Sequence, residues 1–313
     1  MADELVYFVN GKYLPKSKAC ISVLDHGLLY GDGVFEGIKV YDGFVYRLDE
    51  HLERLYKSAR FVHIEIPYTK EELKELILDL LARNCLYEKA YIRLVVTRGI
   101  GDLGINPKKC TFGTSVIIIT DRIQIYPQEL YEQGIKCITC STRRLSVQTM
   151  SVEAKTLNYL SNILGIIEAN NAGADEGIML TVDGYVSEAT VDNVFIVKDG
   201  QVFTPPTYMG ILPGITRAAV METAVELGIP CEERILTTFD LYTADEVFLT
   251  GTAAELVPVV EIDGRVIGEG RPGPIFRRLL EGFRATLSDH GTPIPRREEA
   301  VGSELSRDGE EAG

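Results

Sequence analysis

The segment Asp183-Gly-Tyr-Val-Ser-Glu-Ala-Thr-Val-Asp-Asn-Val-Phe195 contains the pattern that decides the fold class. It begins with an Asp-Gly pair, and Asn-Gly and Asp-Gly pairs are strong signals for the two-residue type I′ turns that join antiparallel strands. Four more such pairs lie between β-branched or aromatic residues, at Asn10-Gly11, Asp42-Gly43, Asp199-Gly200 and Asp263-Gly264. The sequence therefore predicts several β-hairpins.

Amphipathic helices are predicted between these hairpins. The residues Thr69-Lys-Glu-Glu72 form a capping box, and apolar side chains follow it at helical spacing. A second apolar stripe predicts a helix with one buried face, and it consists of Leu160, Ile163, Leu164 and Ile167. Because hairpins and helices occur without regular strand–helix–strand alternation, the sequence predicts a mixed α/β fold of α+β character rather than a Rossmann sheet.

The 313 residues are enough for two domains. A strand-like run ends near residue 120, so we expect a small N-terminal α/β domain over residues 1–120 and a polar linker over 121–130. Periodic patterns then continue to about residue 285, which predicts a larger C-terminal domain over residues 131–285. Residues 286–313 are rich in Gly, Pro, Arg and Glu, and we expect them to form a disordered tail.

The composition argues against several broad classes of protein. Acidic side chains outnumber basic ones by 46 to 32 and the formal net charge is −14, so a general nucleic-acid or anionic-lipid surface is not expected. No apolar run approaches the roughly 20 residues of a membrane span. The six cysteines are dispersed and the N-terminus has no secretory signal pattern, which predicts a cytoplasmic protein.

Several catalytic motifs are absent from the sequence, namely the Walker loop, GxGxxG after a strand, GxSxG and HExxH. Cys137-Ile-Thr-Cys140 matches a CxxC pattern, but it lies in a strand-like run, where this spacing places the two sulfurs on opposite faces. No second Cys or His pair accompanies it. We therefore interpret both cysteines as structural thiols and predict no metal site.

Two glycine-containing turns are candidates for binding an anion. The segment Leu212-Pro-Gly-Ile-Thr-Arg217 leads into a helix, so the backbone amides of Ile215 and Thr216 would face a ligand at its N-terminus. The turn Thr250-Gly-Thr-Ala-Ala254 follows a strand and offers further amides and hydroxyls. Together the two turns would suit a phosphate, although each one alone is typical of an ordinary turn or helix cap.

Lys155 is the candidate nucleophile, and it stands in Val152-Glu-Ala-Lys-Thr-Leu-Asn-Tyr-Leu160, ahead of a predicted helix. If helical geometry begins here, Lys155 and Tyr159 are i,i+4 neighbours and approach the same ligand. A lysine that loses solvent is able to form a Schiff base or act as a general base. The spacing alone, however, favours an ordinary solvated lysine at a helix start.

Four other polar or aromatic residues are ambiguous when each is taken by itself. Glu188 lies in the strand after Asp183-Gly184, and most strand carboxylates are simply solvated. Arg54 falls off the apolar stripe of its predicted helix. Tyr91 and Arg93 are two apart in a strand and therefore share one face.

Taken together, these residues resemble the fold type IV pyridoxal-phosphate enzymes, and the branched-chain amino acid aminotransferases most closely. The resemblance covers roughly residues 5–285. It implies a two-domain fold like that of D-amino acid aminotransferase, with pyridoxal 5′-phosphate between the domains. Its most specific segments are Tyr30-Gly-Asp-Gly-Val-Phe-Glu-Gly37, Lys155-Thr-Leu-Asn-Tyr159, Gly184–Asn193, Leu212–Arg217 and Thr250-Gly-Thr-Ala-Ala-Glu255.

The resemblance also implies a role for each candidate. Lys155 would hold the cofactor as a Schiff base and then move the proton between substrate and cofactor carbons. Glu188 would face the pyridine nitrogen, and Tyr159 would hydrogen-bond the ring hydroxyl. The residues implied for the phosphate are Arg54, Ile215, Thr216 and Thr252. Those implied for the substrate are Tyr30, Phe35, Gly37, Tyr91, Arg93, Arg98, Thr252 and Ala253.

The implied reaction is a ping-pong transamination. An amino group from L-leucine, L-isoleucine or L-valine would pass to the cofactor and then to 2-oxoglutarate. Small amino acids and 2-oxo acids are thus the expected partners, with no nucleic acid and no membrane. A homodimer or higher homo-oligomer is also implied, in which the loop Gly99–Ile105 would complete the active site of a neighbouring subunit.

Some features point to other members of the fold. The spacing from Lys155 to Tyr159 and the arginine in Thr97-Arg-Gly99 resemble the D-amino acid aminotransferase branch, so D-amino acids or (R)-amines are alternative substrates. Aminodeoxychorismate lyase chemistry and a non-catalytic binding protein are the remaining alternatives. Tyr91-Ile-Arg93 and Gly251-Thr-Ala-Ala254 fit the transaminases better.

Overall fold

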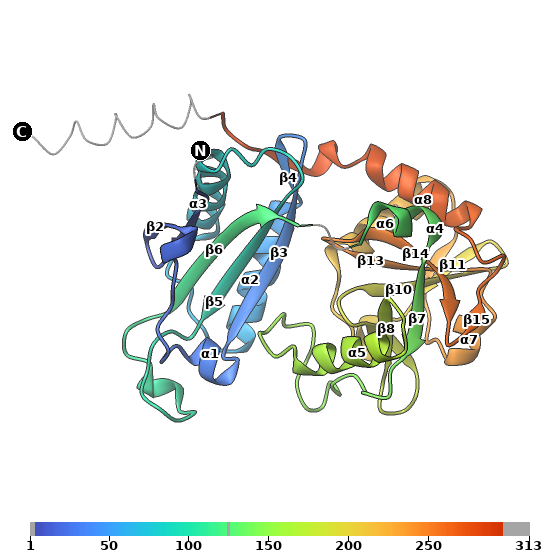
Figure 1. The fold of residues 1–313 in the computed structure, drawn as a ribbon, viewed down its shortest axis with the longest axis horizontal. Coiled ribbons are helices and arrows are strands. Elements are labelled where there is room, and N and C mark those ends of the chain that lie inside the picture. The colour runs from blue at the N-terminus through green and yellow to red at the C-terminus, as the bar shows by residue number, and fades with distance from the viewer. Residues whose placement is uncertain (1–3, 124–125, 297–313) are drawn as a thin grey trace, which may run out of the picture. The chain divides into compact units, whose positions relative to one another are not determined.

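The computed structural model describes residues 4–123 and 126–296, which form two compact units (Figure 1). Unit 1 contains residues 4–123, Lys155–Leu157 and residues 288–296. Unit 2 contains residues 126–154 and 158–287. The short segment around Lys155 therefore belongs to unit 1, although unit 2 flanks it on both sides in the sequence.

Unit 1 is a seven-stranded antiparallel sheet with two long helices on one face. The strand order is β16 (Gly291–Pro293), β4 (Phe44–Tyr46), β3 (Gly33–Tyr41), β5 (Ala90–Thr97), β6 (Ser115–Arg122), β1 (Val6–Val9) and β2 (Lys12–Pro15). The helices are α1 (His26–Tyr30), α2 (Leu48–Phe61) and α3 (Lys70–Arg83). Helix α2 packs on β3, and α3 packs on α2, β1 and β6.

The two faces of β3 and β5 differ because side chains alternate along a strand. Val34, Ile38, Ile92 and Leu94 point to one face and are fully buried in the core beneath α2 and α3. The alternate positions of both strands point to the opposite face, where Tyr91 and Arg93 are only partly buried. The predicted substrate residues of these strands lie on that second face.

Unit 2 is a nine-stranded mixed sheet. Its main path is β12 (Cys231–Glu233), β11 (Gln201–Thr204), β10 (Asn193–Lys198), β13 (Glu246–Gly251), β14 (Glu255–Ile262), β7 (Ile135–Thr139), β8 (Glu176–Leu180) and β9 (Val186–Ala189), and β15 (Arg265–Val266) pairs with β14. Its helices are α4 (Gln128–Gln133), α5 (Leu160–Asn171), α6 (Ile215–Glu226), α7 (Thr238–Tyr242) and α8 (Pro274–Ala285). Helix α5 packs on β8, whereas α6 and α8 pack together and on β13. Short 3-10 turns occur at Lys16–Lys18, Pro107–Lys109, Thr207–Met209 and Ser288–His290.

The five predicted turn pairs all connect paired antiparallel strands. At Asn10-Gly11, Asp199-Gly200 and Asp263-Gly264 both residues have positive φ, as a type I′ turn requires. At Asp42-Gly43 and Asp183-Gly184 only the glycine does, so those two turns are not type I′. The capping box at Thr69 and Glu72 is present, with both reciprocal hydrogen bonds.

Helix α5 contradicts the sequence analysis in two ways. It begins at Leu160, so Lys155 and Tyr159 are not neighbours on a helix. Its buried face consists of Asn162, Gly165 and Ala169. The aliphatic stripe predicted to be buried is exposed, at 69% for Leu160, 51% for Ile163, and 46% for Leu164 and Ile167. The reason is the close approach of α5 to the sheet, since a Cβ atom at Gly165 would lie 3.0 Å from a methyl carbon of Thr190.

The predicted linker and tail also differ from the structure at their edges. Strand β6 extends to Arg122 and α4 begins at Gln128, so the predicted linker is largely regular structure. The expectation of a disordered tail from residue 286 is wrong for Gly291–Pro293, which pair with β4 as β16. Residues 297–313, the remainder of that predicted tail, lie outside the described residues. Across the described ranges, no helix is long and apolar enough to cross a membrane.

Candidate active site

Lys155 lies in an extended segment that continues the sheet of unit 1. Thr156 forms an antiparallel bridge with Val34 in β3. The Phe35 amide donates a hydrogen bond to the Lys155 carbonyl at 3.0 Å, and the Leu157 amide donates to the Gly33 carbonyl at 2.9 Å. The Lys155 amide donates to Ser58 Oγ at 3.0 Å, which ties the segment to α2 as well. The backbone of Lys155 is thus fixed by β3 and α2 together.

The predicted substrate residues of unit 1 gather around the Lys155 side chain. Lys155 Nζ lies 4.6 Å from the centroid of the Phe35 ring. The Arg93 guanidinium carbon lies 4.6 Å from the same ring and 5.5 Å from the Tyr91 ring. A Cβ atom at Gly37 would lie 1.8 Å from Tyr91 Oη, so the position of Tyr91 requires glycine there. One face of the sheet therefore combines an amine, a guanidinium and two aromatic rings.

Arg54 occupies the opposite face of β3, where it pairs with a buried carboxylate that we did not predict as a site residue. Arg54 Nε and Nη2 donate to the two oxygens of Glu36 at 2.7 and 2.8 Å. His51 Nδ1 lies 2.7 Å from Glu36 Oε2. Burial raises the pKa of a carboxyl group, but here Arg54 and His51 outweigh it and hold the pKa of Glu36 well below its usual range. Glu36 is consequently an anion inside the protein.

Tyr30 and Arg98 lie near the loop that we expect to reach a neighbouring subunit. Tyr30 Oη accepts a hydrogen bond from the Gly104 amide at 2.8 Å. The Arg98 guanidinium donates to both oxygens of Asp32 at 2.9 and 3.0 Å, and to the Val62 carbonyl at 2.7 Å. These contacts give Arg98 a structural role between the Asp32 turn and the end of α2. Its predicted contact with a substrate carboxylate stays a prediction.

In unit 2, Glu188 is buried and receives three hydrogen-bond donors. One oxygen accepts from Arg144 Nη2, and the other accepts from Asn193 Nδ2 at 2.9 Å and from the Leu212 amide at 3.0 Å. Arg144 is itself buried, and its Nε donates to the Gly210 carbonyl at 3.1 Å. Our sequence analysis missed Arg144, since a single arginine after a strand carries no motif; its nearness to Glu188 appears only in the fold.

Helix α6 begins as the predicted anion site requires. Gly214 is its N-cap, and no side chain caps the helix there. A Cβ atom at Gly214 would lie 2.0 Å from Asn193 Oδ1, so the turn needs glycine. Ile215 and Thr216 are buried in the first turn of α6. Because Asn193 also contacts Glu188, this helix start and the predicted partner of the ring nitrogen share one hydrogen-bond network.

The other predicted contacts of unit 2 lie at two chain turns. Thr252 and Ala253 occupy the turn that joins β13 to β14, where Gly251 pairs with Glu255. A Cβ atom at Gly251 would lie 1.8 Å from Asp192 Oδ1, which again requires glycine beside the turn. Tyr159 is the N-cap residue of α5.

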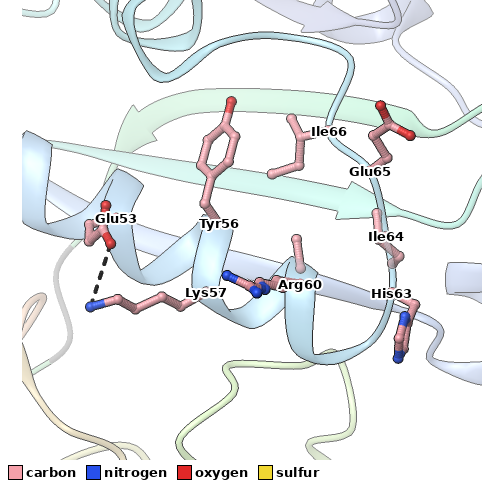
Figure 2. A pocket seen from close by; sticks show the side chains of 9 residues that line it. Glu53, Tyr56, Lys57, Arg60, His63, Ile64, Glu65 and Ile66 are labelled. Atoms are coloured by element: carbon pink, nitrogen blue, oxygen red, sulfur yellow. Dashed lines mark ion pairs between the residues drawn. The ribbon is translucent and has the colours of Figure 1, made fainter.

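A separate cavity of about 540 Å³ lies in unit 1 on the outer side of α2 (Figure 2). Its polar lining includes Glu53, Lys57 and Arg60, and Figure 2 shows the ion pair between Lys57 and Glu53, whose atoms are 3.5 Å apart. None of the predicted site residues lines this cavity. It is therefore distinct from the Lys155 face of the same unit.

Comparisons with known proteins agree with this set of residues. Residues 33–262 match the family described as Amino-transferase class IV. The chain is 53% identical over 287 residues to the putative branched-chain-amino-acid aminotransferase of Methanocaldococcus jannaschii, which covers 92% of this chain and 98% of that protein.

Two solved structures extend the agreement to the fold. The Escherichia coli branched-chain amino acid aminotransferase gives a TM-score of 0.88 at 40% identity, covering 93% of this chain and 97% of that one. The branched-chain amino acid aminotransferase of T.th., solved with pyridoxamine 5′-phosphate, gives 0.89 at 36% identity, covering 94% and 100%. The chain therefore belongs to the class IV aminotransferase family, with the two-unit fold of its branched-chain members.

Proposed function

We propose that this protein is a branched-chain amino acid aminotransferase. It would use pyridoxal 5′-phosphate to transfer the amino group of L-leucine, L-isoleucine or L-valine to 2-oxoglutarate in a ping-pong reaction. The observation that carries the proposal is the fixed Lys155 amine beside Phe35, on the face that also holds Arg93. The names of the similar proteins support the same substrates.

The residues of the two units fit the cofactor chemically. Lys155 offers the amine that would hold it, and Glu188 offers the anion that a protonated ring nitrogen needs. The glycine-dependent, side-chain-free start of α6 suits a phosphate, together with Arg54 and Thr252. When bound, the cofactor supplies an electron sink for the charge that develops on the substrate carbon.

The chain's own residues would position and protonate the substrate. The Lys155 amine would take the proton from the substrate α-carbon and return it to the cofactor carbon. Tyr159 would hydrogen-bond the ring hydroxyl, and the amides of Thr252 and Ala253 would bind the α-carboxylate. Each of these contacts orients the reacting atoms, so binding and catalysis would depend on the same side chains.

One pocket would have to accept both an apolar and an acidic side chain. Phe35, Tyr91 and Tyr30 offer aromatic surface for leucine or valine. Arg93 lies over two of these rings and offers a guanidinium for the side carboxylate of glutamate. An arginine stacked on aromatic rings presents apolar and charged surfaces in the same place, which explains how one site would serve both substrates.

We further propose a homodimer or a higher homo-oligomer in the cytoplasm. The large aliphatic side chains of α5 are exposed whereas its small residues are buried, an arrangement that a second copy of the chain would explain. The loop Gly99–Ile105 remains our candidate for completing a neighbouring site. All six cysteines are free thiols, which fits a reducing compartment. Light scattering of the wild type and of an Ile163→Glu variant tests the assembly, because a charge in that stripe would dissociate it.

The proposed activity is tested with the purified full chain and a donor panel. We expect a visible absorption band from Lys155-bound cofactor that disappears on addition of L-leucine, and glutamate formation that requires 2-oxoglutarate. No band after addition of pyridoxal 5′-phosphate would contradict the cofactor assignment. Turnover of D-alanine or (R)-1-phenylethylamine above that of L-leucine would instead favour the D-amino acid or (R)-amine alternative.

A further inference from the structure

We propose that Glu36 and His51 are positioning residues that fix Arg54 for the cofactor phosphate. This inference rests on the proposed function, because it assigns Arg54 to the phosphate. It adds a buried anion and a neutral histidine to a site whose contact residues are otherwise donors. All three residues belong to unit 1, and their mutual geometry is therefore defined within one compact unit.

The carboxylate of Glu36 is entirely committed to these two partners. Its side chain is 0% exposed, and both of its oxygens accept hydrogen bonds from Arg54, at 2.7 and 2.8 Å. Oxygen Oε2 also contacts His51 Nδ1 at 2.7 Å. The Arg54 side chain is 11% exposed, which places it between the buried pair and the surface of the unit. A guanidinium has five N–H donors, so this bidentate pair is compatible with binding a phosphate oxygen as well.

The pair acts through geometry rather than through its charge. Glu36 is an anion, so its field alone would oppose the binding of a phosphate. A free arginine side chain has about 2 kcal/mol of rotamer entropy, and a bidentate contact removes much of that freedom before the ligand arrives. The expected benefit of Glu36 is therefore the orientation of Arg54, which is opposite in sign to its direct electrostatic effect.

His51 in turn orients Glu36. Burial, opposed by the neighbouring Glu36, lowers the pKa of His51, so the ring is neutral near pH 7. Because ionised Glu36 can only accept, we assign the proton to Nδ1, which donates to Oε2. His51 Nε2 is buried and has no hydrogen-bond partner among the described residues, so the Glu36 contact is the one that fixes the ring. The sequence places His51 and Arg54 three apart on α2, directly over Glu36.

The test compares a ligand that has the phosphate with one that lacks it. Pyridoxal 5′-phosphate and pyridoxal are titrated separately against the full chain, and binding is followed by the absorption of the Lys155-bound form. We expect Glu36→Gln to weaken pyridoxal 5′-phosphate by roughly tenfold, a loss like that on removing outer partners of metal ligands. Pyridoxal, which needs Lys155 but not Arg54, is expected to bind as in the wild type.

Two further variants separate positioning from folding. His51→Leu removes the donor to Glu36 and is expected to weaken pyridoxal 5′-phosphate, whereas the amide of His51→Asn replaces Nδ1 and is expected to restore binding. In an Arg54→Gln background, Glu36→Gln is expected to cost nothing more, because Glu36 acts only through Arg54. Glu53→Gln is the matched control: it removes a glutamate of α2 that pairs with Lys57 and Lys70 and has no contact with the triad.

The outcomes distinguish this inference from the proposed function. Equal losses for both ligands would mean that Glu36 supports the fold and not the phosphate contact, and would overturn the inference. Unchanged or tighter binding of pyridoxal 5′-phosphate by Glu36→Gln would overturn it too. A wild-type protein that binds neither ligand at Lys155 would overturn the proposed function and this inference together.

Discussion

Each unit contains one buried arginine–carboxylate pair, but the two pairs present opposite charges for binding. In unit 1 the carboxylate of Glu36 is the deeper partner and Arg54 is the predicted ligand contact. In unit 2 both Arg144 and Glu188 are buried to a similar degree, and the carboxylate is the predicted ligand contact. The difference shows that the same ion pair serves a phosphate or a ring nitrogen, depending on which member the fold directs to the ligand.

The two pairs also differ in their remaining partners. Glu188 has two donors besides Arg144, namely the Asn193 side chain and the Leu212 amide. Glu36 has only His51 besides Arg54 among the hydrogen bonds that the described residues define. A buried carboxylate with fewer alternative donors depends more on its arginine, so the pair in unit 1 is the more vulnerable of the two.

The largest effect is expected where catalysis is removed while both pairs are left intact. Lys155→Ala deletes the amine that would hold the cofactor and move the proton, so turnover of L-leucine should fall by at least roughly 10²–10⁴-fold. Its free energy of unfolding should change little, because the hydrogen bonds with the Phe35 amide and the Ser58 hydroxyl involve the Lys155 backbone and are retained. Full turnover by this variant would contradict the assignment of Lys155.

The comparison itself is tested by removing each arginine. Arg144→Met and Arg54→Met each leave a buried carboxylate without its cation, which typically costs about 3–5 kcal/mol. We expect the larger loss for Arg54→Met, since Glu36 retains fewer donors than Glu188. Urea unfolding followed by circular dichroism measures both losses.

The surface pair of Arg271 with Glu269 supplies the control for these two variants, because both side chains are largely exposed. Arg271→Met should leave stability nearly unchanged. A larger loss for Arg144→Met than for Arg54→Met would reverse the ranking of the two pairs.

A smaller effect is expected from pH, and it acts on unit 1. The pKa of His51 is lowered in the folded protein, below the value of about 6.5 that an unfolded chain would have. The unfolded state then binds more protons, so stability falls as the pH drops below about 6.5. The pKa of Glu36 is also lowered, and its stabilisation, complete above the unfolded value of about 4.3, is lost only as pH falls towards its folded pKa.

The urea midpoint should therefore decrease between pH 7 and pH 5, and His51→Asn should remove part of that decrease. Glu36 should add little in this interval, since its carboxylate is ionised throughout. Equal decreases for the wild type and the His51→Asn variant would show that other groups control stability in this range.

The smallest predicted effect concerns the contact between α2 and the backbone of Lys155. Ser58→Ala removes the hydroxyl that accepts the Lys155 amide and should cost about 1 kcal/mol, the usual scale of one hydrogen bond. If that contact also fixes Lys155 for catalysis, turnover should fall several-fold. A Ser161→Ala change near the start of α5 serves as the control, and both are compared by thermal unfolding and by leucine kinetics.

Local signals were sufficient for much of the fold. The Asn-Gly and Asp-Gly pairs marked hairpin turns correctly, and the capping box at Thr69 marked the start of α3, because each of these patterns stabilises its structure through nearby backbone atoms. The family resemblance supplied the order of the site residues, and the structure brings Phe35, Tyr91 and Arg93 to the Lys155 side chain as expected.

Features that depend on distant neighbours were not predictable. The stripe on α5 has helical spacing, but periodicity does not tell which side of a helix faces the sheet; here Gly165 and Ala169 permit the closer approach. Arg144 and His51 gain their roles from Glu188 and Glu36, which lie 44 and 15 positions away. The pairing of β16 with β4 joins the two ends of unit 1 and has no local signature.

The return of the chain to the sheet of unit 1 has a consequence for how the protein folds. Residues Lys155–Leu157 complete the edge of β3, and β16 completes the edge of β4, yet both follow long segments of unit 2. Pairings so distant in sequence raise the contact order and slow folding. During synthesis the first 123 residues would present two incomplete sheet edges until residue 293 leaves the ribosome. We therefore expect the lysine to enter its place late, as part of one cooperative event that involves nearly the whole polypeptide.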